Sequence, residues 1–192
     1  MPGEVTVARF QRYDDGMTVG TLMTADELLG LPDDSWRYEL VKGELRKMSP
    51  SGAQHGRVSA RVIASLINHV LPRHLGEVYS SEAGFIIARN PDTVRAPDAA
   101  FVRQERAIDA PGFFVGPPDA AFEVVSPGDS YSEVEEKTGE WLRAGVQVVV
   151  ILDPRRRTVR IHRASGTLIA EDAIEIDDVI PGWRATFSEL FD

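Results

Sequence analysis

The sequence contains no cysteine, which excludes disulfide bonds, thiolate catalysis and every cysteine-based zinc or iron–sulfur site. Its four histidines are scattered, with no HExxH motif or comparable spacing, so a histidine-based zinc site is not expected. Any metal bound here would therefore be held mainly by oxygen ligands, which are the ligands that Mg²⁺ prefers.

Long apolar runs are also missing, and positive charge is scarce. No stretch approaches the roughly 18 apolar residues that indicate a membrane span, and the first residues, MPGEVTVARFQRYDDG, lack the layout of a signal peptide. We therefore expect a cytoplasmic protein with no membrane partner. The 30 acidic residues outnumber the 21 basic ones, and the net charge of −9 opposes nonspecific phosphate binding unless basic residues are locally concentrated.

What the chain does contain is enough apolar sequence for a substantial core. Its 192 residues, of which 43% are hydrophobic, match the size and composition of one globular domain. We expect a single domain over residues 1–192, with an N-terminal arm or edge strand over residues 1–22 and a core over about 24–190.

Local patterns predict a short helix, a hairpin and a long helix in the first third of the chain. TADELLGLP predicts a short helix, because Thr24 and Glu27 have the spacing of a capping box. WRYELVKGELRKMSP consists of two alternating runs around Lys42-Gly43, which predicts a β-hairpin. From residue 53 to about 75, apolar residues follow three-and-four spacing, which predicts the longest amphipathic helix in the chain.

The remaining patterns predict a central sheet. Its expected strands are EVYSS, GFIIA, PDAAFV and AAFEVV, then VQVVVIL, RTVRIHR and the region around residues 168–176 at a sheet edge. A helix over about 130–144 between AAFEVV and VQVVVIL implies a right-handed parallel crossover. WRATFSELFD is expected to end the chain as a strand and a short helical turn. The fold class is therefore α/β (mixed α+β), with a central mixed sheet flanked by helices.

Two acidic residues stand within these apolar strands. Alternation places Asp98 on the same face as Ala100, and Glu123 on the same face as Ala121. A buried carboxylate is costly unless it is neutralised, paired with a cation or bound to a metal. If the two strands are neighbours with these faces aligned, the carboxylates repel each other unless a cation lies between them, and Mg²⁺ suits such a site.

Lys137 adds a positive charge to these acids. On the predicted helix it lies at the flank of the buried stripe, beside Val134 and Trp141, so its stem can follow that surface and bring the ammonium back to the end of the Glu123 strand. Two acids and a lysine are what a metal-dependent phosphodiesterase needs. The metal neutralises phosphate and lowers the pKa of its water, while the lysine orients that water or stabilises growing charge.

Several ordered motifs resemble a known family. They are YELVKGEL, GAQHGRV, TVRAPDAAFV, PDAAFEVVSPGD, EVEEKTGEWLRAGV and VVVILDPRRRTVRIHR. Over roughly residues 20–190 the chain is similar to the Uma-type endonucleases, a branch of the PD-(D/E)XK nuclease superfamily. The resemblance implies a restriction-endonuclease-like fold and dependence on a divalent metal. We expect Mg²⁺, with Mn²⁺ as a substitute, and DNA as the substrate. The resemblance also implies a homodimer, the usual way for small nucleases to cut two strands.

The resemblance assigns residues to the site as well. The implied catalytic residues are Asp98, Glu123 and Lys137, with Glu39 and His55 as second-rank candidates. The expected metal ligands are Asp98, Glu123 and the backbone carbonyl of Val124. In the superfamily's usual pattern the lysine stands two residues after the second acid, where this chain has Val125. Lys137 would therefore be a lysine that has migrated to the following helix.

Each main candidate also has a purely structural interpretation. Asp98 fits a strand start or a turn cap, and Glu123 with Lys137 fits a buried ion pair that binds no metal. Lys137 also fits a solvated helix residue paired with Glu133, four residues before it. His55 fits a hydrogen-bonding residue at a helix N-terminus.

The other candidates also have purely structural interpretations. Glu39 fits the exposed member of a hairpin pair. Arg155, Arg156 and Arg157 begin the only dense basic segment, which fits either phosphate contacts with DNA or a solvated guard on an edge strand. Three functions therefore stay open: a Mg²⁺-dependent endonuclease acting on DNA, a catalytically silent descendant that binds nucleic acid or a protein partner, and a hydrolase of a smaller phosphodiester.

Overall fold

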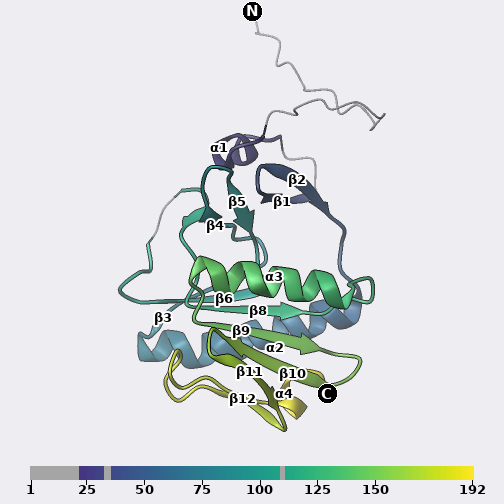
Figure 1. Ribbon diagram of the computed structural model, residues 1–192. Coiled ribbons are helices and arrows are strands. Elements are labelled where there is room, and N and C mark those ends of the chain that lie inside the picture. The colour runs from purple at the N-terminus through teal and green to yellow at the C-terminus, as the bar shows by residue number, and fades with distance from the viewer. Residues whose placement is uncertain (1–21, 33–35, 109–110) are drawn as a thin grey trace, which may run out of the picture.

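The computed structural model describes residues 22–32, 36–108 and 111–192. The N-terminal arm expected over residues 1–22 lies, apart from Leu22, outside this part of the chain. The described residues form a mixed α/β structure in which a six-stranded sheet, a five-stranded sheet and a two-stranded sheet combine with helices (Figure 1). This confirms the predicted fold class.

The six-stranded sheet is the predicted central sheet. In spatial order its strands are β11 (Gly166–Ala170), β10 (Thr158–Arg163), β9 (Val148–Asp153), β8 (Ala120–Val124), β6 (Ala99–Arg103) and β3 (Gly76–Ser80). β8 and β9 are parallel and the other pairs are antiparallel. The expected strand–helix–strand crossover is therefore present, because α3 (Tyr131–Ala144) connects the two parallel strands.

The five-stranded sheet contains a strand that the sequence analysis placed wrongly. Its order is β2 (Glu44–Met48), β1 (Arg37–Val41), β5 (Thr93–Arg95), β4 (Phe85–Ala88) and β7 (Phe114–Val115). GFIIA forms β4, which was expected in the central sheet. Phe85 packs with Trp141 of α3, and Ile86 packs against the buried residues beside α1 (Ala25–Leu29). β4 is therefore apolar on both faces without being a central strand.

The predicted turn and helix signals are confirmed. Lys42 and Gly43 both have positive φ, 51° and 81°, as a two-residue hairpin turn requires. Thr24 and Glu27 form the capping box of α1. The remaining helices are α2 (Ala53–Val70), which continues as the 3₁₀ turn η1 (Leu71–Arg73), and α4 (Phe187–Phe191).

The C-terminal strands differ in part from the prediction. Of the region around residues 168–176, β11 does lie at the edge of the central sheet, but β12 (Ala173–Glu175) pairs with β13 (Arg184–Thr186) in a separate sheet. Ile174 and Trp183 are almost completely buried in the core cluster that contains α2. Burial of these two side chains draws β12 away from the edge of the central sheet.

The two long helices cover opposite faces of the central sheet. α2 packs through Val58, Val62 and Leu66 against one face, and α3 packs through Trp141 against the other. Figure 1 shows α3 lying between the central sheet and the five-stranded sheet. Within the described ranges, no helix combines the length and apolar character that crossing a membrane requires.

Candidate active site

Asp98 and Glu123 lie on neighbouring strands. In the antiparallel pairing of β6 with β8, Ala99 is opposite Phe122, so Asp98, directly before β6, lies beside the Glu123 end of β8. The Asp98 carboxylate accepts a hydrogen bond of 2.8 Å from the Val124 N–H through Oδ2. The predicted alignment of the two acids is therefore present.

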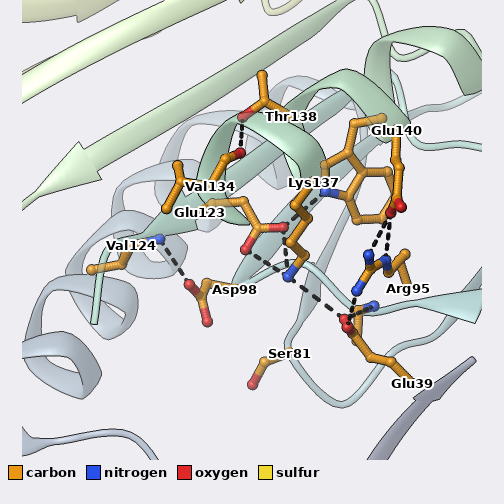
Figure 2. Close-up of polar contacts among 12 residues, drawn as sticks. Glu39, Ser81, Arg95, Asp98, Glu123, Val124, Val134, Lys137, Thr138 and Glu140 are labelled. Carbon is orange, nitrogen blue, oxygen red and sulfur yellow. Dashed lines mark hydrogen bonds and ion pairs between the residues drawn. The ribbon is translucent and has the colours of Figure 1, made fainter. Parts of the chain in front are cut away.

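Glu123 receives its partners from α3. Lys137 Nζ donates a hydrogen bond of 3.0 Å to Glu123 Oε2 (Figure 2). Trp141 Nε1 donates one of 2.8 Å to Glu123 Oε1. Lys137 and Trp141 are four residues apart, so they project from the same side of the helix. The alternative pairing of Lys137 with Glu133 is not formed, because Glu133 caps the helix by contacting Ser130.

Burial sets the charge state of this pair. It raises the pKa of Glu123 to about 7; the Lys137 ammonium opposes this rise, while the charges of Asp98 and Glu39 add to it. Burial alone would lower the pKa of Lys137, but the negative charges of Glu123, Glu39 and Asp98 outweigh it and raise that pKa. Lys137 is therefore charged at neutral pH, whereas Glu123 titrates there.

Glu39 holds the other side of the lysine. Its side chain on β1 is buried, with Oε1 3.5 Å from Lys137 Nζ. It accepts hydrogen bonds of 2.6 Å from Arg95 and 3.0 Å from the Ala96 N–H. Burial would raise the pKa of Glu39, but the charges of Lys137 and Arg95 outweigh it and lower that pKa. The interpretation of Glu39 as an exposed hairpin residue is therefore wrong.

His55 contacts Asp98 from the opposite layer of the protein. It lies in the first turn of α2, with Nε2 3.0 Å from Asp98 Oδ2 and Nδ1 3.4 Å from the Ser59 hydroxyl. Burial opposes the charged imidazole, but the hydrogen bond to Asp98 and its negative charge outweigh burial and raise the pKa of His55. A charged His55 stabilises the Asp98 carboxylate.

These side chains border one cavity of about 550 Å³. All five residues predicted for the site line this cavity, as does Val124, whose carbonyl was expected to bind metal: Glu39, His55, Asp98, Glu123 and Lys137. The structure thus brings together residues from β1, α2, the start of β6, β8 and α3.

The donor set fits a hard divalent ion. In the described part of the chain, no cluster of three or more histidine, aspartate or glutamate side chains is arranged to hold a metal. Asp98 and Glu123 nevertheless present two carboxylates to the cavity. Mg²⁺ binds proteins through one or two carboxylates and keeps several waters, so two acids and a neighbouring carbonyl are a sufficient protein contribution.

Comparison with protein families identifies the family of this chain. Residues 25–188 match the model of the family Uma2, described as "putative restriction endonuclease". The chain belongs to the Uma2 family. No curated protein matches this Uma2 chain. A crystal structure described as that of a "putative nuclease belonging to DUF820" from Anabaena variabilis ATCC 29413 is similar, with a TM-score of 0.75 and 20% sequence identity. The alignment covers 88% of the Uma2 chain and 97% of that protein, and it shows a common fold.

Three residues at the Uma2 site were not predicted from the sequence as site residues: Arg95, Glu140 and Trp141. Arg95 is buried between Glu39 and Glu140, and its Nε donates a hydrogen bond of 2.8 Å to Glu140. Glu140 is three residues after Lys137, which is the one local indication that it lies on that side of α3. Trp141 was expected to be buried, and a buried indole N–H needs an acceptor, but the identity of that acceptor depends on the tertiary fold.

The basic run lies beside the Uma2 cavity without lining it. Arg155, Arg156 and Arg157 form the exposed turn between β9 and β10. Arg155 donates a hydrogen bond of 3.0 Å to the carbonyl of Pro127, in the loop that precedes α3 and borders the cavity. Arg157 pairs with Asp192, which neutralises part of the positive charge of this turn.

Proposed function

We propose that this Uma2 protein is a divalent-metal-dependent endonuclease that hydrolyses phosphodiester bonds in DNA. The observation that carries the proposal is the arrangement of Asp98 and Glu123 side by side at one cavity, with the Lys137 ammonium 3.0 Å from Glu123. Two acids and a lysine at a cavity are what metal-assisted phosphodiester hydrolysis needs, and membership of Uma2 supports the same reaction.

In this proposal Asp98, Glu123 and the Val124 carbonyl hold Mg²⁺, for which Mn²⁺ can substitute. When bound there, the metal would neutralise phosphate charge and lower the pKa of the attacking water. The Lys137 ammonium orients that water and stabilises negative charge that grows on the phosphate. His55 holds the Asp98 carboxylate in place through its contact of 3.0 Å.

DNA contacts are proposed for the turn formed by Arg155, Arg156 and Arg157. The protein carries a net charge of −9, so phosphate binding depends on a local concentration of positive charge. The contact of Arg155 with Pro127 places this turn beside the loop that borders the cavity. A phosphate backbone entering the cavity would therefore pass these side chains.

A second candidate function is a catalytically silent protein that binds nucleic acid or a protein partner. The observation that favours it is the Glu123–Lys137 contact, because a buried ion pair with a hydrogen-bonded Trp141 needs no metal to be satisfied. The acidic net charge in turn favours the third candidate, a hydrolase of a smaller phosphodiester.

One set of incubations separates these functions. The purified protein is mixed with plasmid, single-stranded DNA, branched DNA or a small phosphodiester, in Mg²⁺, Mn²⁺ or chelator. We expect metal-dependent cleavage of DNA that Asp98→Asn abolishes and the control Asp172→Asn, at an exposed carboxylate, retains.

Calorimetric titration of Mg²⁺ and Mn²⁺ should show binding that Asp98→Ala and Glu123→Ala both lose.

The contrary outcomes are equally distinct. DNA binding without cleavage in any metal would identify a silent protein, and cleavage of the small diester alone would identify the third function. Unchanged metal binding in both alanine variants would remove the proposed metal site.

A further inference from the structure

The cavity has a second wall that the proposed chemistry does not use. It is bordered by α1, by the residues that follow α1, and by β1 and β2 of the five-stranded sheet. Leu29, Trp36 and Met48 on this wall are 53%, 44% and 37% exposed. Large apolar side chains gathered at one exposed concave surface indicate a binding site.

Positive charge accompanies these apolar side chains. Lys47 Nζ lies 3.5 Å from the centre of the Trp36 ring, in a cation–π contact, and Arg46 lines the same cavity. An aromatic surface next to cations is the combination with which proteins bind unpaired nucleotides, because the base stacks on the ring and the cations face the backbone.

We propose that this wall, formed by Leu29, Trp36 and Met48, binds the base of an unpaired nucleotide of the DNA substrate, next to the phosphate held at Asp98 and Glu123. The substrate class is therefore single-stranded or locally opened DNA. This inference rests on the proposed nuclease function and deepens it.

The shape of the site favours an unpaired base over an intact duplex. A duplex presents phosphates and sugars outward and keeps its bases stacked inside, so an apolar wall beside the scissile phosphate would find no apolar partner. A cavity of about 550 Å³ lies within the size range of sites for single small ligands. Enzymes that admit one base to such a site use single strands or extrude the base from the helix.

The test compares strands that differ only in their bases. Binding of fluorescent oligothymidylate of about 12 nucleotides, an abasic strand of equal length and a duplex is measured with Ca²⁺ in place of Mg²⁺. We expect the thymidylate to bind most tightly. Trp36→Ala should weaken its binding roughly 5- to 150-fold, the equivalent of about 1–3 kcal/mol for one stacked base, and should leave abasic binding unchanged.

Two further variants control for structure. Trp36→Phe keeps an aromatic face and should restore most of the thymidylate affinity. Tyr131→Ala removes another exposed aromatic side chain, 69% exposed and outside the cavity lining, and should leave all three affinities unchanged. Melting temperatures of the Trp36 variants show whether the fold is retained.

Each contrary outcome has a definite meaning. An equal loss of thymidylate and abasic binding in Trp36→Ala, or no loss, would overturn the base site. A Trp36-dependent change in oligomeric mass without a change in base preference would instead identify the wall as a contact between copies. Cleavage of duplex DNA with no dependence on bases would reject this inference alone, whereas failure to bind or cleave any strand would reject the nuclease function as well.

Discussion

Lys137 is the residue on which the proposed chemistry depends most. Its ammonium lies 3.0 Å from Glu123 and 3.5 Å from Glu39, and both carboxylates are largely shielded from solvent. Lys137→Met keeps most of the stem volume and removes the charge. We expect single-turnover DNA cleavage to fall on the order of 100-fold, about 2.7 kcal/mol in the barrier, with a smaller change in metal affinity.

Lys137→Met also affects the stability of the protein, because two buried carboxylates lose their cation. We therefore expect Lys137→Met to lower the melting temperature as well, so cleavage is measured well below it. Lys42→Met, at the exposed hairpin turn, provides a control with the same change. Near-normal cleavage by Lys137→Met would reject the lysine as part of the active site.

The raised pKa of Glu123 predicts that the stability of the metal-free protein depends on pH. The Glu123 pKa of about 7 in the folded state exceeds the ordinary value of 4.5, so the folded protein holds this proton more tightly than the unfolded chain. The resulting stability is fully present below the ordinary pKa and is lost as pH rises through about 7. In chelator, the melting temperature of the native protein should therefore fall relative to that of Glu123→Gln, on the order of 5 °C between about pH 5 and pH 8.

Metal provides the control for this experiment. Excess Mg²⁺ favours the ionised carboxylate and should remove most of the difference in pH profile. Parallel pH profiles of the two proteins in chelator would contradict the raised pKa of Glu123.

At the residue scale, the sequence predicts those contacts that strand alternation and helical spacing determine. Strand alternation and helical spacing indicated that Asp98, Glu123 and Lys137 face one another, and the structure places them together. Arg95 and Glu140 were not predicted as partners, because their contact joins the five-stranded sheet to α3 across 45 residues. No local pattern reports such a contact.

At the scale of elements, Arg95 connects the five-stranded sheet to α3 through Glu39 and Glu140. Arg95→Met would leave both buried carboxylates without this cation, and we expect a loss of about 3 to 5 kcal/mol in the free energy of unfolding. Urea denaturation measures this loss. Arg163→Met serves as the control, because Asp178 in its ion pair is 58% exposed, and it should cost under about 1 kcal/mol. Similar small losses in both variants would show that Arg95 does not support the junction.

Elements with strong local signals were predictable, whereas their sheet membership was not. The capping boxes, the Lys42-Gly43 turn and the left-handed Gly145 after α3 fix where elements begin and end. β4 has the apolar pattern of a central strand, yet it pairs with β5 and β7 because both of its faces are covered by other apolar clusters. Pairing depends on distant partners, which composition along one strand does not specify.

At the scale of the whole molecule, the acidic net charge makes the basic turn a testable DNA contact. Replacing Arg155, Arg156 and Arg157 with alanine should weaken DNA binding and make its salt dependence shallower by roughly one unit per lost phosphate contact. Salt titration of binding affinity measures both effects.

The control must remove equal charge elsewhere. Replacing Arg73, Arg143 and Arg184, all exposed and outside the cavity lining, changes the net charge by the same amount. Equal effects from the two triple variants would assign the change to overall charge and reject the turn as the DNA face. The expected homodimer stays a prediction, which sedimentation of the native protein tests.

The placement of Lys137 on the crossover helix also determines when the proposed site is completed during synthesis. A growing chain exposes Asp98 and Glu123 first, and the ammonium follows on α3. β8 then lacks its parallel neighbour until β9 emerges from the ribosome, since proteins are built from the N-terminus onward. Incomplete translation products ending before residue 137 would carry both acids without the ammonium, so a stalled ribosome would release only fragments in which the proposed site is incomplete.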